Sequence, residues 1–230
     1  SNGVAVDVRV KRTINANEWS TLVLPFNMSA AQVQAVFNNE NVQLLGLAEF
    51  LGWETTEYDN NDNATAINVS FGDVNAITAN TPYIIKVSKK ITEFTVDGVV
   101  IDPEDDPGVS VGKINKGTFG SFMGSYVPTT IDEECLFLSE NKFWYSTGLT
   151  NMKGFRAYFY FQDLLADYNN YSSARIMLSF SGEETTGVGA PKSDNGEKKR
   201  DNVIYNLNGQ RVSKPAKGLY IINGKKRVVK

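Results

Sequence analysis

The side chains that most often do chemistry in enzymes are scarce in this chain. Its 230 residues include no histidine and one cysteine, which excludes histidine-based catalysis, Ser-His-Asp and Cys-His nucleophile systems, and His or Cys zinc sites. A single cysteine also excludes an internal disulfide. A pair of carboxylates, as in glycosidases, remains, with Glu133, Glu134 and Asp163 as candidates. No spacing selects one pair from the 26 acidic residues, so we predict no catalytic residue and no enzyme activity.

Two acidic loops, residues 59–63 and 102–106, carry closely spaced oxygen atoms of the kind that Ca²⁺ prefers. The first loop lacks the glycine and the distal glutamate of an EF-hand, and Pro103 interrupts the second. We therefore expect solvated turns, with no metal and no cofactor.

Aromatic side chains beside short polar residues are the candidate binding groups. Surfaces that recognise proteins or glycans often combine rigid aromatic area with short hydrogen-bonding side chains. The candidates are Trp53, Tyr58, Trp144, Tyr145, Tyr168, Asn169, Asn170 and Tyr171. An alternative interpretation is that the tryptophans belong to the core and that the loop around residues 168–171 is only a polar connection.

Strands must position these groups. Val4, Val6, Val8 and Val10 alternate with other residues, which is the period of a strand with one solvated face. Residues 29–38 predict one short helix, with Ser29 as its N-cap. Further strands are predicted at residues 19–26, 42–54, 65–71, 82–87, 94–101, 118–127, 135–139, 155–161 and 174–180. We expect an all-β fold, an antiparallel β-sandwich or a barrel-like variant, with Cys135 in a buried strand.

The C-terminal part differs from the rest. Three strand-like runs at residues 203–207, 218–222 and 227–229 are separated by Asn-Gly pairs, which predicts a small antiparallel meander. We expect a body at residues 1–181, a polar linker at 182–201 and the meander at 202–230. Residues 192–230 hold 11 basic and 3 acidic residues, against 12 basic and 23 acidic before them. Without a nucleic-acid motif or a stacking platform, this basic tail does not predict nucleic-acid binding.

Two resemblances suggest a context. The end of the C-terminal sorting domain that Bacteroidetes use for type IX (Por) export resembles this tail at Tyr205, Leu207, Asn208, Gly209, Val212, Gly218, Leu219, Tyr220 and the closing residues 226–230. Residues 18–26, 81–86 and 154–159 are similar to segments of large, adhesion-like surface proteins of gut Bacteroidetes. The resemblances imply a β-rich module at the cell surface or outside the cell, without catalytic residues to carry over.

Taken together, these features favour a non-enzymatic module for adhesion or ligand binding, exported although no signal peptide is visible. Its expected partner is a glycan or a host or bacterial surface protein, with no nucleic acid. No apolar run is long enough to span a membrane. Two alternatives stay open: a purely structural domain of a surface assembly, and a carboxylate-based glycan hydrolase.

Overall fold

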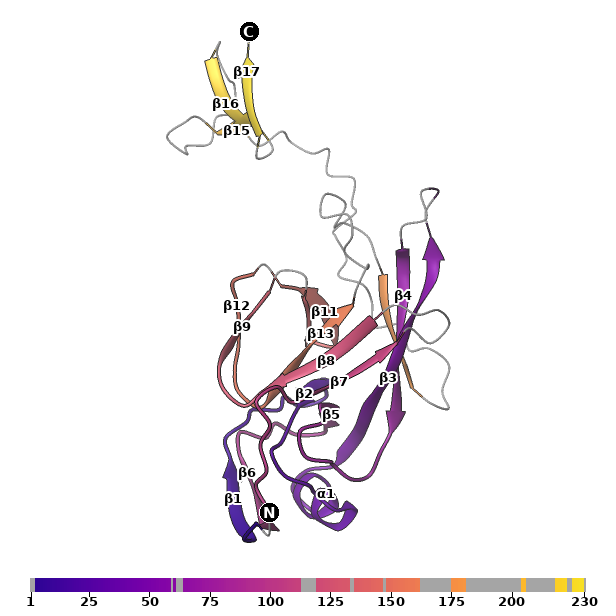
Figure 1. Cartoon of the computed structure of the whole chain (residues 1–230), viewed down its shortest axis with the longest axis vertical. Helices are drawn as coiled ribbons and strands as arrows, with labels where there is room; N and C mark the ends of the chain where they lie inside the picture. The colour runs from indigo at the N-terminus through magenta and orange to yellow at the C-terminus, as the bar shows by residue number, and fades with distance from the viewer. Residues whose placement is uncertain are drawn as a thin grey trace. The chain divides into compact units, whose positions relative to one another are not determined.

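The computed structural model describes residues 3–58, 60, 64–112, 119–132, 135–146, 148–161 and 175–180, with three strands nearer the C-terminus (Figure 1). The chain divides into two compact units, residues 1–191 and 192–230. Strands dominate the described residues, which confirms the predicted all-β fold. Within them, no helix has the length and apolar character needed to cross a bilayer. The predicted linker at 182–201 lies outside the described residues.

Two five-stranded sheets build the first unit. The first sheet has the order β14-β4-β3-β5-β2 and comprises β2 (Ser20–Leu22), β3 (Leu44–Tyr58), β4 (Ala64–Asp73), β5 (Tyr83–Val87) and β14 (Arg175–Phe180). The second has the order β11-β10-β13-β8-β7 and comprises β7 (Gly108–Gly112), β8 (Phe119–Ser125), β10 (Cys135–Ser139), β11 (Lys142–Tyr145) and β13 (Arg156–Phe161). Their pairings are antiparallel except that of β14 with β4. One cluster of buried side chains draws on both sheets, as in a sandwich.

Aromatic rings fill the space between the sheets. Phe122 and Phe159 lie directly opposite each other on β8 and β13, and their rings stack with centroids 4.1 Å apart. From the first sheet, the rings of Phe50 and Phe71 meet Phe159 edge-on at 5.9 and 6.1 Å. Rings at these distances and angles attract one another beyond the burial of their area. This cluster therefore fixes how the two sheets face each other.

The first sheet is buried on both faces. Ala48 and Ile84 face the sandwich core, while their chain neighbours Leu47 and Ile85 belong to a second apolar cluster on the opposite face. That cluster also contains side chains of helix α1 (Ala30–Phe37) and of the antiparallel pair β1 (Val6–Val10) and β6 (Phe94–Val99). The predicted helix is confirmed, with Ser29 and Gln32 forming its capping box.

A short ribbon covers part of the outer face of the second sheet. It pairs β9 (Thr129–Ile131) with β12 (Thr150–Met152), and its residues Ile131 and Met152 cluster with the buried Cys135. The buried position of Cys135 confirms that prediction. In the second unit, β15 (Ile204–Tyr205), β16 (Gly218–Ile222) and β17 (Lys225–Val229) form the predicted antiparallel meander.

Candidate functional site

A cavity of about 250 Å³ opens where β2, β10, β12 and β13 meet. The pairing of β9 with β12 places the ribbon on one side of it, and β13 supplies the side chain of Arg156. Along β13, Ala157, Phe159 and Phe161 are buried in the sandwich core. Because alternate side chains of a strand point to opposite faces, Arg156 lies on the outer face, toward the cavity.

The positive charge of Arg156 has no counter-charge within the described part of the chain. Its Nε atom is buried without a hydrogen-bond partner, and the one ion pair among the described residues joins Arg9 to Glu93. Burial lowers the pKa of Arg156. A buried N–H of a cation is costly when it has no partner, because the protein does not replace the hydrogen bond that it made to water. An anion entering the cavity would restore part of that lost interaction.

A second arginine lies close to the first but is fully occupied. Arg12 is only 2% exposed, and its guanidinium donates to three backbone oxygens: from Nε to Phe155 at 3.2 Å, from Nη2 to Thr21 at 2.7 Å, and from Nη1 to Thr13. Burial, and then the charge of Arg156, lowers the pKa of Arg12 to about 9. Arg12 therefore stays protonated at neutral pH and adds a positive field to the site, while each of its three nitrogens donates to a backbone oxygen.

The backbone around the two arginines is tightly constrained. Thr21 accepts the bond from Arg12 with its carbonyl, and its Oγ1 accepts the N–H of Ala157 at 2.9 Å. Phe155 adopts a φ of 58°, and a Cβ at Gly154 would lie 2.3 Å from the backbone oxygen of Tyr126. A side chain at position 154 would thus clash with backbone, so the turn that leads into Arg156 has little freedom.

The rest of the cavity wall combines hydrogen-bonding and apolar groups. Lys153 and Asn151 are exposed at it, and the Asn151 Oδ1 accepts from the Thr130 hydroxyl at 2.9 Å. Phe137 and Met152 supply apolar surface. Among the described residues that line the cavity, none is acidic. The site therefore offers donors for an anion and an apolar wall for the group that carries it.

Of the predicted aromatic residues, Trp144 lies beside this cavity. It is 37% exposed and directly opposite Phe137 in the β10–β11 pairing. Its Nε1 donates to the backbone oxygen of Ser139, a residue of the cavity wall, at 3.1 Å. The hairpin that carries Trp144 turns through Glu140 and Asn141, both with positive φ, as a two-residue hairpin turn requires. An exposed indole thus extends the surface around the cavity.

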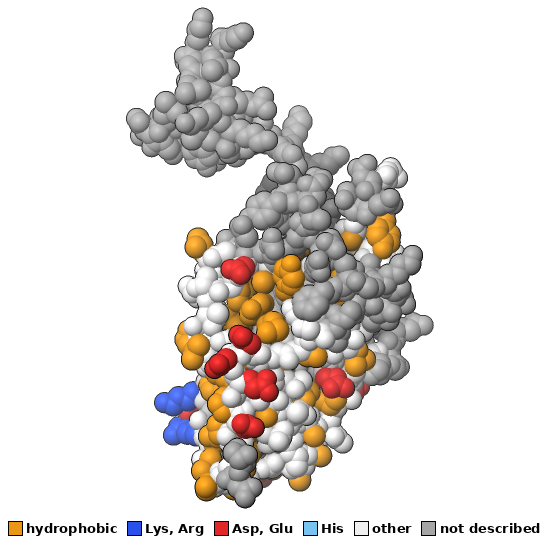
Figure 2. Space-filling view, viewed as in Figure 1, with side chains coloured by type: hydrophobic (Ala, Val, Ile, Leu, Met, Phe, Trp, Pro, Cys, Tyr) orange, Lys and Arg blue, Asp and Glu red, His pale blue; other side chains and the backbone are white. Residues whose placement is uncertain are grey.

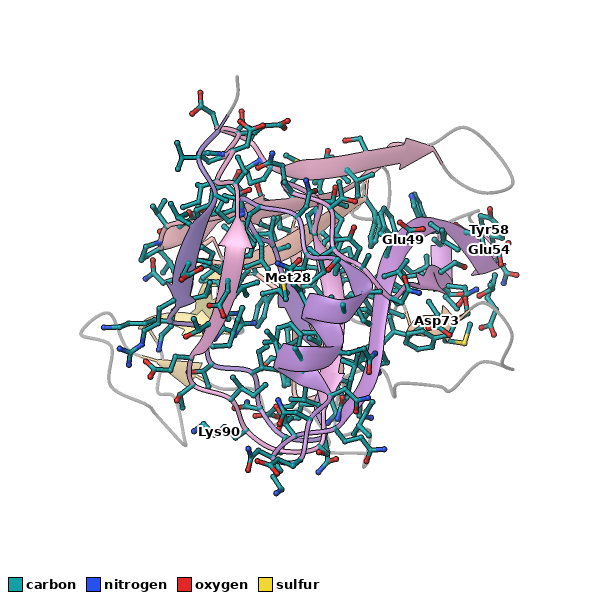
Figure 3. The ribbon with its side chains drawn as sticks, turned by 90° about the horizontal axis from the view of Figure 1, so that it is seen from below. Met28, Glu49, Glu54, Tyr58, Asp73 and Lys90 are labelled. Atoms are coloured by element: carbon teal, nitrogen blue, oxygen red, sulfur yellow. The ribbon has the colours of Figure 1, made fainter. Side chains whose placement is uncertain are left out.

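The other predicted contact residues do not gather here. Trp53 is 2% exposed and packs against Phe161 in the core, so it is no longer a candidate contact. Tyr145 packs against the same core, while Tyr58 is 57% exposed at the end of β3, near Glu54 (Figure 3). The following candidates lie outside the described residues: Tyr168, Asn169, Asn170 and Tyr171 for binding, and Glu133, Glu134 and Asp163 for catalysis.

Two other hollows have different chemistry. A hollow of about 590 Å³ is lined by Glu49 of β3 and Asp73 of β4, both labelled in Figure 3. A groove of about 690 Å³ beside α1 and β6 mixes basic residues, including Lys90, with acidic ones, including Asp97. The groove therefore carries charges of both signs. In neither hollow does an unpaired, partly buried charge meet an apolar wall.

The acidic loop at residues 102–106 is held through its backbone. The Asn80 side chain donates to the carbonyl of Asp102 at 2.9 Å and accepts the N–H of Glu104 at 3.1 Å. No group of three or more metal-ligating side chains occurs in the part of the chain that the structure describes. These two bonds connect the backbone of the loop to Asn80.

The charge around the cavity contrasts with that of the body. Acidic side chains are scattered over the described part of the face shown in Figure 2, and the basic side chains visible there lie at one margin. No family model matches the chain, and no curated protein or solved structure matches it significantly. What the site can do has to be inferred from its own residues.

Proposed function

We propose that this chain is a non-enzymatic β-sandwich module that binds a glycan or a surface protein, in adhesion or ligand capture. The observation that carries the proposal is the partly buried Arg156, whose Nε has no partner among the described residues, in a cavity with apolar and hydrogen-bonding walls. Natural ligand sites are concave and mostly apolar, with a few placed polar groups. The cavity is below the roughly 300 Å³ typical of sites that enclose a whole small ligand, so it would take the end of a larger one.

The same wall argues against catalysis at this place. Acid–base chemistry needs a group that can accept or release a proton near neutral pH. The titratable side chains that the described residues bring to the wall are Lys153 and Arg156, and these residues include no carboxylate that could act as a base or a nucleophile. The hydroxyls of Thr150 and Ser139 have no adjacent histidine, because the chain contains none. Binding is what this set of groups can do.

Location at the cell surface or outside the cell is part of the proposal and rests on the sequence resemblances. The tail resembles a sorting domain, and segments of the body resemble adhesion-like surface proteins. A fractionation experiment with the native gene product, probed by an antibody to the body, tests this part separately. Recovery from the cytoplasm alone would contradict it.

An array of neutral glycans, acidic glycans and surface proteins tests the binding function. The purified chain should bind at least one class, and Ser139→Trp, which places a ring at the exposed cavity mouth, should abolish that binding. Thr95→Trp is the matched control, because Thr95 is an exposed strand residue outside the cavity. The proposed site would be contradicted if the chain bound no glycan and no protein on the array, or if Ser139→Trp left the binding intact.

A purely structural role has one observation in its favour. Val4, Val100 and Ile101 are 80%, 41% and 49% exposed, and a Cβ at Gly3 would touch Val100. This apolar surface at the ends of β1 and β6 suits contact with a neighbouring domain. If no ligand class binds and Val100→Glu weakens assembly with adjacent domains of the same protein, the structural role is the better one.

The hydrolase alternative has one place among the described residues. Glu49 and Asp73 line the same open hollow, and carboxylate pairs of suitable separation cleave glycosidic bonds. Turnover of a polysaccharide that Glu49→Gln abolishes would support it. Absence of turnover across polysaccharide substrates would contradict it.

A further inference from the structure

We infer that the cavity recognises a ligand that carries one carboxylate, and that a carboxylated sugar is the class that fits it. This inference rests on the proposed binding function and names the chemistry of its ligand.

Arg156 offers the charge in a form that suits a carboxylate. Its Nε is enclosed, so a ligand would meet the terminal nitrogens, whose parallel N–H groups match the two oxygens of a carboxylate. Arg12 is held away from this ligand, because each of its three nitrogens donates to a backbone carbonyl, of Thr13, Thr21 or Phe155. Lys153 is exposed at the rim and adds a weaker, solvent-screened attraction.

The acidic body limits the ligand to few negative charges. Residues before 192 carry 12 basic and 23 acidic side chains, so a polyanion meets repulsion at long range. A single carboxylate enters the local field of Arg156 and Arg12 with little of that repulsion. A long sulfated chain or a nucleic acid would meet that repulsion along its whole length.

The remaining wall suits a sugar ring. Phe137 and Met152 offer apolar surface to the carbon face of a ring. Asn151, Thr150 and Ser139 offer amide and hydroxyl groups to its hydroxyls. Outside the cavity, the exposed Trp144 can receive the next sugar of a chain. A peptide carboxylate would use Arg156 but leave most of these polar groups without partners.

Calorimetric titration of the whole chain with methyl β-glucuronoside and methyl β-glucoside tests the inference, because the two sugars differ only at the carboxylate. We expect saturable binding of the acid, and binding of the neutral sugar weaker by a factor of about 10 or more. Arg156→Gln should weaken binding of the acid by a factor of about 50 or more, and Arg156→Lys by about 10, since lysine keeps the charge but loses the fork. Lys153→Gln should cost only a factor of about 3.

Lys90→Gln is the matched control, because Lys90 is exposed outside the cavity and loses the same charge. It should leave binding of the acid unchanged, and all variants should keep the wild-type melting temperature within a few degrees. In a second arm, an acetylated peptide with a free C-terminal carboxylate and inorganic phosphate compete with the sugar acid. We expect both to bind more weakly than the sugar acid does.

Each contrary result has a defined meaning. Equal binding of the acid and the neutral sugar, or binding unaffected by Arg156→Gln, overturns the carboxylate while the binding function stands on the array. Tighter binding of the peptide overturns the sugar, and tighter binding of phosphate overturns the carboxylate. If no small carboxylate binds although the array gives binding that Ser139→Trp abolishes, the ligand class is wrong and the site is right.

Discussion

Arg12 and Arg156 lie close together, yet the hydrogen bonding of their guanidinium groups differs. Arg12 is enclosed and gives its donors to three backbone carbonyls. Arg156 is half-buried, faces a cavity and has no partner among the described residues. Burial is the main cause that lowers the pKa of both. Both cations are therefore partly desolvated, but the described residues supply hydrogen-bond acceptors only to Arg12.

The difference separates a structural role from a binding role. The bonds of Arg12 connect the segment after β1, the strand β2 and the turn before β13, so they hold the scaffold together. An unsatisfied charge does nothing for the fold, and sites with such local costs are often those that serve function. Removing Arg12 should therefore reduce stability, whereas removing Arg156 should reduce binding.

Arg12→Met should have the largest effect on stability. It keeps the volume but leaves three carbonyls without donors, at about 1 to 3 kcal/mol each, and this loss is partly offset because a buried charge is removed. We expect a net decrease of about 3 kcal/mol in the free energy of unfolding, measured by urea denaturation. A change below about 1 kcal/mol would mean that the three hydrogen bonds of Arg12 contribute little to the stability of the fold.

Gly154→Ala should have the next largest effect and tests how firmly Arg156 is positioned. The added methyl group would lie 2.3 Å from the backbone oxygen of Tyr126, so the turn into β13 has to move. We expect a loss of about 2 kcal/mol in stability, with weaker binding of the sugar acid although Arg156 is still present. Unchanged binding would show that the turn does not hold Arg156 in place.

Tyr126→Phe should have a smaller effect, and one that depends on pH. The Tyr126 hydroxyl donates to Asn80 Oδ1 at 2.5 Å, and its ring contacts Phe155, which binds Arg12. Burial, and then the charge of Glu104, raises the pKa of Tyr126 from 10.0 to about 12. The variant should lose about 1 kcal/mol near neutral pH, through the missing hydrogen bond.

The pH dependence follows from that raised pKa. A group whose pKa is raised by folding stabilises the protein below its unfolded pKa and loses this contribution as the pH rises through the folded value. Wild type should therefore lose stability between about pH 10 and pH 12 relative to Tyr126→Phe. Urea midpoints of both proteins at about pH 8 and pH 11 measure this difference. A constant difference would show that the tyrosine is not perturbed.

Arg156→Met should change stability least. No bond to a described residue is lost, and the desolvation of a half-buried charge is relieved, so we expect a change within about 1 kcal/mol, in the stabilising direction. Binding of the sugar acid should nevertheless disappear in the same preparation. A destabilisation comparable with that of Arg12→Met would show that Arg156 is a structural residue and would remove the basis of the comparison.

Much of the fold could be predicted because its signals are local. The alternation of residues 4–10, the Ser29 cap and the Asn-Gly pairs of the tail each act over a few residues, and the structure shows β1, α1 and the meander there. The four strands that sequence patterns missed are β7, β9, β11 and β12, which have three to five residues each. In β12, Thr-Asn-Met carries no strand pattern, and only pairing with the distant β9 makes it extended.

The candidate site could not be predicted, because it depends on contacts between segments that are separated in the sequence. Arg156 lies at the start of a correctly predicted strand, but its importance depends on the ribbon that covers one face of that strand and on Arg12, which is distant in the sequence. Trp53 and Trp144 both adjoin polar segments, and only strand pairing shows that one is enclosed while the other is exposed. The sequence signal that could have indicated this site is the alternation that places Arg156 on the same strand face as Tyr158 and Tyr160.

The double-sided burial of the first sheet has a consequence for how the body unfolds. Leu47 and Ala48 on β3, like Ile84 and Ile85 on β5, belong alternately to two apolar cores that share this sheet as a common wall. Opening either core would expose the wall of the other, so the two should lose structure in one cooperative transition. The amide hydrogens in the central part of β3 should then exchange with solvent only through global unfolding, and report the full stability of the body.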